Sequence, residues 1–284
     1  MDQHQDMIMS AVSAPGSYRG RPFLRWAGSK RQILPILARY WRNSYSRYVE
    51  PFAGSASLFF YLSPSRALLS DINVDLIATY CEVQNNLPRV LLSLSKLKRG
   101  RRNYLAIRAT DSRLLNPHER AARFIYLNRY CYNGLYRTNL AGEFNVPYGG
   151  DKSGDLPPRE LFQHCYVELQ KAELASASFE ESLQRVRPGD FVYLDPPFSV
   201  KSRRVFSEYY GSSFGTHSLK PLREWLLKLD RQQVSFLVSY AESKEANYLS
   251  RGFHTEIVSV KRSIAGFAQN RVSTNELLIS NCHI

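Results

Sequence analysis

The sequence predicts a mixed α/β sheet that carries an inserted helical subdomain. Short apolar runs read as strands at 48–49, 67–69, 191–194, 235–238, 257–260 and 276–279. Amphipathic helical patterns separate some of these runs, as at 74–83 and 219–229, and this alternation is typical of an α/β sheet. No helical pattern separates the last two strands, so we expect an antiparallel hairpin at one sheet edge.

The middle of the chain has a different pattern. It is helical from about 76 to 128, and the segment "CYNGLYRTNLAGEFNVPYGG" follows at 131–150. That segment is rich in Asn, Gly and aromatic residues and holds turn signals, so we predict a hairpin or ordered loop there. We therefore expect a sheet domain from 21–75 and 155–284, an insertion at 76–154, and a disordered tail at 1–20.

The charge balance indicates a polyanionic partner. The 284 residues include 38 Lys+Arg and 25 Asp+Glu, for a formal net charge of +13. Nucleic acid explains this excess better than a merely solvated basic surface. The four cysteines form no CxxC pair, which argues against a zinc site or a disulfide framework. No apolar run reaches the roughly 18 residues of a membrane span, and no signal peptide opens the chain, so we expect a cytoplasmic protein.

Two strand ends predict a nucleoside-containing cofactor. In "RYVEPFAGSASLFFYL" at 47–62, a strand leads into a turn of small residues that lets a ligand approach the backbone. The next strand ends at Asp71, 17 positions after Gly54. An acidic residue about 20 positions beyond such a turn binds ribose hydroxyls in α/β nucleotide sites. The alternatives are a structural turn and a helix-capping role for Asp71, although Asn73 is also suited to cap that helix.

The stretch "DFVYLDPPF" at 190–198 predicts a site for a planar base with an exocyclic amine. Asp195 follows a buried strand, at the edge where open α/β sheets bind ligands. Pro196 and Pro197 stiffen the loop and leave carbonyl acceptors, and Phe198 offers a stacking face. Hydrogen bonds from the amine to Asp195 and to the Pro196 carbonyl would make its nitrogen a better nucleophile by positioning and electrostatics. Taken alone, the motif is better explained as a strand that ends at a Pro-Pro stop.

Taken together, the motifs resemble the Dam-type family of site-specific DNA adenine-N6 methyltransferases. The resemblance spans about residues 23 to 281 in the family's order. It is carried by "FLRWAGSK" at 23–30, "VEPFAGSASLF" at 49–59, "SDIN" at 70–73, "LNRYCYNGLYRTNLAGEFNVPYG" at 127–149, "YLDPPF" at 193–198 and "KRSI…ELLISN" at 261–281. It implies a Rossmann-like mixed sheet that uses S-adenosylmethionine, with an inserted helical DNA-recognition subdomain.

The resemblance also assigns site residues. The catalytic tetrapeptide that holds the flipped adenine matches Asp195, Pro196, Pro197 and Phe198. The cofactor positions match Trp26, Lys30, Pro51, Gly54, Asp71, Phe179 and Asp195. The DNA-binding positions match Arg25, Tyr132, Asn133, Leu135, Arg137 and Pro147. The resemblance requires no metal.

These assignments are physically coherent for a base-flipping enzyme. A base must leave the duplex to reach a catalytic pocket, and Tyr132 would fill the space it leaves. Arg137 is suited to guanine N7 and O6, and Leu135 and Pro147 to a thymine methyl group. The basic stretches 96–102 and 201–204 are expected to contact phosphates. Arg25 stands where relatives that read GATC usually carry lysine, at a position that helps select the first guanine.

We therefore expect methyl transfer from S-adenosylmethionine to the N6 amine of a flipped adenine in duplex DNA, with GATC as the site. The expected partners are double-stranded DNA and a cognate restriction endonuclease that acts separately, and the expected state is a DNA-associated monomer without membrane contact. Methylation of cytosine N4 or of RNA is the alternative within the class. A catalytically silent DNA-binding regulator is the alternative outside it, and the missing GxGxxG motif disfavours a dehydrogenase.

Overall fold

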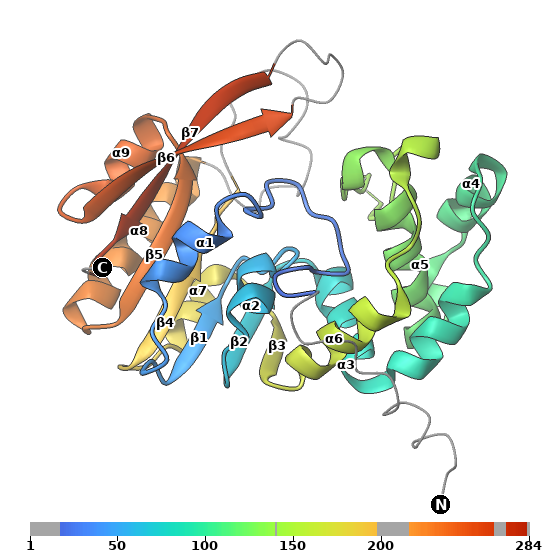
Figure 1. The fold of residues 1–284 in the computed structure, drawn as a ribbon, viewed down its shortest axis with the longest axis horizontal. Helices are drawn as coiled ribbons and strands as arrows, with labels where there is room; N and C mark the ends of the chain where they lie inside the picture. Colours follow the sequence, from blue (N-terminus) through green and yellow to red (C-terminus); the bar gives the residue numbers. More distant parts are fainter. Residues whose placement is uncertain (1–17, 140, 198–215, 264–270, 283–284) are drawn as a thin grey trace, which may run out of the picture.

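The computed structural model describes residues 18–139, 141–197, 216–263 and 271–282. Its centre is a seven-stranded sheet in the order β3-β2-β1-β4-β5-β7-β6. The strands are β1 (Arg47–Glu50), β2 (Ala67–Asp71), β3 (Ala172–Ser176), β4 (Asp190–Leu194), β5 (Ser235–Ala241), β6 (His254–Ser263) and β7 (Arg271–Ser280). The first five in this order are parallel, and β7 runs antiparallel to both of its neighbours. The mixed sheet and the antiparallel hairpin at its edge are thus confirmed (Figure 1).

Helices cover both faces of this sheet. They are α1 (Leu34–Leu37), α2 (Ser57–Leu62), α3 (Val74–Ser95), α4 (Arg101–Ala109), α5 (Pro117–Tyr130), α6 (Arg159–Leu169), α7 (Phe179–Gln184), α8 (Thr216–Arg231) and α9 (Lys244–Ser250). Side chains alternate along each strand, so neighbouring positions enter different cores. Tyr48 and Phe191 lie in the core that includes residues of α2, α3, α5 and α6, whereas Val49 and Val192 lie in the core with α7, α8 and α9.

The inserted helices lie beside the sheet and share one of its two cores. The long helix α3 changes direction at Asn86, whose φ of −135° and ψ of 33° are not helical, two residues before Pro88. It packs against β3 and α6 and also against α5. Helix α3 therefore belongs both to the sheet layer and to the insertion predicted at 76–154, while α4 and α5 lie on the far side of the molecule from α8 and α9 (Figure 1).

Two details differ from the sequence-based expectation. The edge strand β3, with the sequence AELAS, was not predicted because it lacks β-branched and aromatic residues. It forms because β2 pairs with all five of its residues. Residues 18–20 were expected in the tail, but they form a turn in which the Gly20 amide donates to the Phe60 carbonyl at 3.2 Å. The rest of the predicted tail, 1–17, lies outside the described residues.

Candidate active site

The carboxylate of Asp195 is the centre of the site. The four apolar residues of β4 that precede it are buried, so the strand carries it to the carboxyl edge of the sheet. Its Oδ1 accepts hydrogen bonds from Lys30 Nζ at 2.7 Å and from Ser239 Oγ at 3.1 Å. The Lys30 side chain is 5% exposed and that of Asp195 22%, so a nearly buried cation holds a carboxylate that a ligand can still reach.

Two residues around the Lys30–Asp195 pair were not predicted from the sequence. Ser239 lies in β5, and its hydroxyl is 2.9 Å from Tyr193 OH. Glu276 opens the apolar part of β7, is 2% exposed, and places Oε2 3.7 Å from Lys30 Nζ. Lys30 therefore bridges two carboxylates. The available sequence signals were weak: a single serine inside an apolar run, and an acid at the start of another.

The other members of the tetrapeptide are described only in part. Pro196 is buried and Pro197 is exposed. Phe198 and the basic stretch 201–204 lie outside the described residues. Their predicted roles stay predictions.

Asp71 ties the small-residue turn to the end of β2. Its Oδ2 accepts from the Gly54 amide at 3.0 Å, and its Oδ1 accepts from the Asn73 amide at 2.9 Å. Asn73 caps α3, because its side chain accepts from the Leu76 amide at 3.1 Å. The capping role thus falls to Asn73, and Asp71 instead shapes the turn that is predicted to bind the cofactor.

Trp26 lies on this turn. Gly54 has φ +46°, and a Cβ atom added to it would lie 2.6 Å from Trp26 Cδ1. The Gly54 carbonyl accepts from Tyr80 OH at 2.8 Å. A side chain at this position would displace the indole, so the glycine is required both by the backbone conformation and by the close approach of Trp26.

The remaining predicted cofactor residues form an apolar wall beside the turn. Phe179 is 6% exposed and stacks on Phe52, with ring centroids 5.5 Å apart and an interplanar angle of 26°. Pro51 is buried, whereas Ile72, next to Asp71, is 47% exposed. A carboxylate beside an apolar wall fits the ribose and adenine of an adenosyl group.

Burial should make cofactor binding depend on pH. Desolvation raises the pKa of Asp71 to about 6, although hydrogen bonds from Asn73 and Gly54 lower it. Asp71 gains a proton as pH falls through about 6 and then accepts ribose hydroxyl hydrogen bonds less well. We expect the affinity for S-adenosylhomocysteine, measured by calorimetry, to fall from pH 7.5 to 5.5. The pH dependence should disappear in Asp71→Asn, and the same slope in that variant would contradict the assignment.

The linked effect on stability has the opposite direction. The pKa of Asp71 is raised above its ordinary value of 3.8, so the native state keeps the proton between about pH 4 and 6 while the unfolded chain loses it. The contribution of this proton to stability is complete below pH 4 and is lost as pH rises through about 6. Protonation of Asp71 therefore favours the folded state. Weaker cofactor binding in acid would not result from unfolding caused by this residue.

Glu50 is a second buried acid at this edge. It ends β1, is 3% exposed, and accepts a hydrogen bond from Tyr48 OH at 2.9 Å. Burial raises the pKa of Glu50 well above its ordinary range, and the nearby carboxylates of Asp195 and Asp71 raise it further. In its protonated form Glu50 can donate a hydrogen bond, whereas an ionised glutamate can only accept.

The segment 131–148 forms the predicted hairpin. Isolated bridges pair Cys131 with Tyr148 and Thr138 with Phe144. Tyr132 is 46% exposed, and its amide donates to the Pro147 carbonyl at 2.8 Å. Of the other predicted DNA contacts, Asn133 and Pro147 are exposed, and Leu135 and Arg137 are partly buried. Arg137 Nε donates to Asn145 Oδ1 at 2.7 Å across the hairpin.

Arg25 joins the N-terminal segment to the insertion. Its Nη2 donates to the Ser153 carbonyl at 2.7 Å, and its amide and carbonyl both pair with the Asn128 side chain at 2.8 Å. A Cβ atom at Gly134 would lie 2.7 Å from Arg25 Cβ. The guanidinium thus has partners within the protein, and its predicted contact with a base stays a prediction.

One short segment therefore connects three parts of the site. Within residues 25–30, Arg25 contacts the insertion, Trp26 lies on the turn around Gly54, and Lys30 holds Asp195. In Figure 1 the segment that precedes α1, drawn in blue, runs between the sheet and the inserted helices. Because β2, β1 and β4 are adjacent, the turn after β1 and the acids at the ends of β2 and β4 lie at one edge of the sheet.

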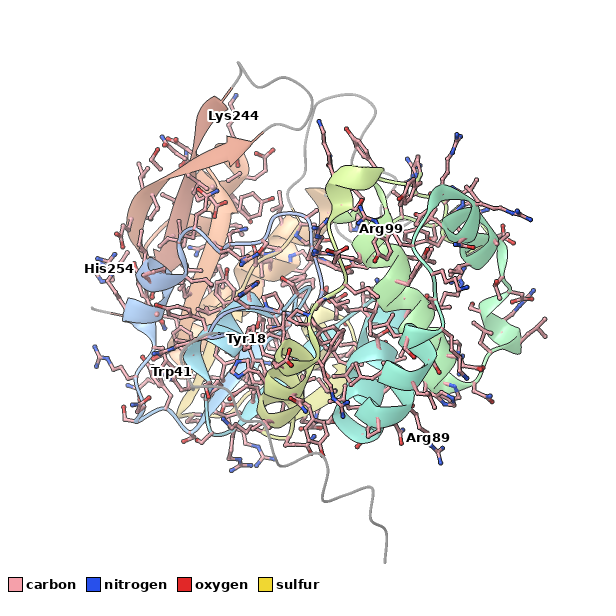
Figure 2. The ribbon with its side chains drawn as sticks, turned by 45° about the vertical axis from the view of Figure 1, so that its right-hand side comes forward. Tyr18, Trp41, Arg89, Arg99, Lys244 and His254 are labelled. Atoms are coloured by element: carbon pink, nitrogen blue, oxygen red, sulfur yellow. The ribbon has the colours of Figure 1, made fainter. Side chains whose placement is uncertain are left out.

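The basic stretch 96–102 lies where α3 ends and α4 begins. Arg101 and Arg102 are exposed in the first turn of α4. Arg99, labelled in Figure 2, instead forms an ion pair with Asp155 at 3.1 Å. Its predicted phosphate contact would compete with this pair.

Within the described residues, no group of three or more His, Cys, Asp and Glu side chains is arranged to hold a metal ion. None of the described helices is both long enough and apolar enough to cross a bilayer.

Several known proteins are similar to this sequence along nearly its whole length. The model of the family described as "D12 class N6 adenine-specific DNA methyltransferase" matches residues 26–264. A DNA adenine methylase of Escherichia coli K12 is 33% identical over 265 residues, covering 92% of this chain and 95% of its own. The Type II methyltransferase M1.LlaDCHI of Lactococcus lactis is 32% identical over 270 residues, with the same coverage.

A third relative is the Type II methyltransferase M.MjaIII of Methanocaldococcus jannaschii. It is 31% identical over 285 residues and covers 92% of this chain and 99% of its own. The family match and these relatives bear out the resemblance found in the motifs. The chain belongs to the D12 class of N6-adenine-specific DNA methyltransferases.

Proposed function

We propose that this protein transfers the methyl group of S-adenosylmethionine to the N6 amine of an adenine flipped out of a GATC site in duplex DNA. The observation that carries the proposal is the carboxylate of Asp195, held at 2.7 Å by the nearly buried Lys30 at the same sheet edge as the Gly54–Asp71 turn. This edge brings an acceptor for an amine close to a turn suited to an adenosyl cofactor.

Several residues would hold the cofactor. The Asp71 carboxylate can accept hydrogen bonds from the ribose, Phe52 and Phe179 offer an apolar wall, and Trp26 lies over the turn. When bound, S-adenosylmethionine supplies an electrophilic methyl group on a positively charged sulfur.

The protein's own contribution is to position and polarise the amine. Asp195 and the Pro196 carbonyl would accept its two N–H bonds and make the nitrogen lone pair more available for attack. Lys30 and Ser239 fix Oδ1 of Asp195 and so set the direction of the carboxylate. The amine loses one proton on methylation, and Asp195 is the acceptor nearest to that proton in this arrangement.

The hairpin supports duplex DNA as the substrate. Tyr132 is a 46% exposed aromatic residue at the base of the hairpin, and it is suited to replace the flipped base in the stack. The bond from Arg137 Nε to Asn145 limits the orientations of the guanidinium, which favours a fixed bidentate contact with guanine.

A second partner that we infer is a separate restriction endonuclease of the same specificity, because two relatives are named Type II methyltransferases.

The site preference can be tested with matched duplexes. We expect labelled methyl groups to enter a duplex with one GATC and not the four duplexes in which a single base of that site is changed. Transfer to adenine in another sequence would overturn GATC and leave the chemistry in place. Transfer to cytosine or to RNA alone would overturn the proposed substrate.

Arg137→Ala should relax the choice of base. We expect a loss of about 1–3 kcal/mol in binding to GATC and a smaller loss with a duplex in which the contacted guanine is replaced. Arg113→Ala is the matched control, because Arg113 lies on the same subdomain with an 87% exposed side chain paired to Asp111. Filter binding at several salt concentrations should show at most a uniform loss for Arg113→Ala, and equal losses on all duplexes for Arg137→Ala would contradict base readout.

A further inference from the structure

Tyr136 connects the recognition hairpin to the cofactor turn. It is only 9% exposed, although the hairpin residues on both sides of it are predicted to read bases. Its ring stacks on Trp26, with centroids 6.0 Å apart and an interplanar angle of 20°. Trp26 in turn lies against Gly54. The ring of a hairpin residue therefore supports the indole that covers the turn.

The hydroxyl of Tyr136 makes a second contact on the cofactor side. It donates to Asp75 Oδ2 at 2.8 Å. Asp75 lies in the first turn of α3, four residues after Asp71. Tyr136 thus contacts both structures that flank the predicted cofactor: the tryptophan over the turn, and the helix that begins next to the ribose-binding acid.

On the hairpin side, Tyr136 packs against residues of the hairpin and of α5. Its ring packs on Phe144 in the returning arm, with centroids 5.6 Å apart, and on Phe124 of α5 at 5.2 Å. A hollow of about 770 Å³ lies beside it and is lined by Asp75, Tyr136 and Phe144 among others. The ring is therefore held between the indole of Trp26, the returning arm of the hairpin and α5.

We propose that Tyr136 is a positioning residue that couples DNA binding at the hairpin to the placement of Trp26 over the cofactor turn. The inference rests on the proposed function, because it takes DNA and an adenosyl cofactor as the two ligands. DNA that fixes the hairpin also fixes the Tyr136 ring, and the indole then needs less ordering when the cofactor binds. By linkage, each ligand raises the affinity for the other by the same factor.

The coupling is measured as a ratio: the dissociation constant of S-adenosylhomocysteine without DNA divided by that with DNA. S-adenosylhomocysteine is titrated into the full-length protein by calorimetry, without DNA and with a saturating GATC duplex. We expect DNA to tighten binding at least about fivefold in the wild type, the lower end of typical coupling. In Tyr136→Leu, which removes the ring and the hydroxyl, we expect the ratio to fall to within twofold of one. Tyr136→Phe keeps the stack on Trp26, so it should recover most of the ratio.

Tyr104→Leu provides the matched control. Tyr104 is a fully buried tyrosine of α4 whose hydroxyl donates to the Val146 carbonyl of the hairpin at 2.9 Å. Its replacement should lower the melting temperature, as Tyr136→Leu does, but keep the wild-type ratio. An unchanged ratio in Tyr136→Leu, or an equal loss in Tyr104→Leu, would show that Tyr136 is only a core residue.

Two measurements distinguish failure of the proposed coupling through Tyr136 from failure of the proposed methyl transfer. The ratio is measured without turnover, so it tests the coupling even if no methyl group is transferred. A wild-type protein that methylates the duplex but shows a ratio of one overturns the coupling alone. A wild-type protein that transfers no methyl group overturns the proposed function.

Discussion

Asp195→Ala is expected to lower the rate of methyl transfer about a hundredfold to a thousandfold while DNA binding persists. The change removes the carboxylate that we propose as the acceptor for the amine, and the loss of one preorganised group of this kind costs about 10²–10³ in rate. The Lys30 ammonium, 2.7 Å from Asp195 Oδ1, would then face the pocket without that partner. Single-turnover transfer of labelled methyl and a gel-shift titration measure the two properties separately.

Asp190→Asn is the control for this prediction. Asp190 begins the same strand, is 3% exposed, and pairs with Arg47 at 2.7 Å, at the end of β4 opposite to Asp195. We expect it to lower stability but to leave the rate of the folded fraction near that of the wild type. A comparable loss of rate in both variants would mean that Asp195 acts only through the strand.

Lys30→Met should have the second largest effect. It leaves the carboxylates of Asp195 and Glu276 without the ammonium that lies 2.7 Å and 3.7 Å from them. Removal of one partner from a buried ion pair costs about 3–5 kcal/mol, because an uncompensated charge remains. We expect a lower free energy of unfolding in urea and, in the folded fraction, a transfer rate reduced about a hundredfold, because Asp195 loses its orientation.

Lys171→Met separates this effect from the general loss of a lysine. Lys171 pairs with Glu168 at 2.9 Å, but its side chain is 32% exposed and the pair lies away from β4. We expect a lower free energy of unfolding here too, because the 8% exposed side chain of Glu168 loses its cation, but a normal transfer rate. A normal transfer rate in Lys30→Met as well would show that Lys30 is not needed to orient Asp195.

The sequence predicted those parts of the site that are local in the chain. Asp71 and Asp195 follow apolar runs, so each could be placed at the end of a strand, and adjacent parallel strands bring such ends to one edge. The turn around Gly54 was visible because small residues cluster there. The resemblance added Trp26 and Lys30, whose importance no local pattern indicates.

The missed residues depend on strand register and on long-range packing. Ser239 approaches Asp195 because Leu194 pairs with Val238, and Asp195 and Ser239 are the next residues along these two parallel chains. No local sequence pattern specifies that register. Glu276 reaches Lys30 because β7 pairs antiparallel with β5 and places Glu276 opposite Ala241. The strand β3 likewise depends on pairing with β2, since its own composition does not favour a strand.

The most direct test of the central claim is the chemical identity of the methylated base. Duplex DNA is incubated with the protein and S-adenosylmethionine carrying a labelled methyl group, digested to nucleosides, and separated by chromatography. We predict that the label appears as N6-methyldeoxyadenosine and that Asp195→Ala forms it at least about a hundredfold more slowly. Label in N4-methyldeoxycytidine, or no label although the DNA is bound, would contradict the account.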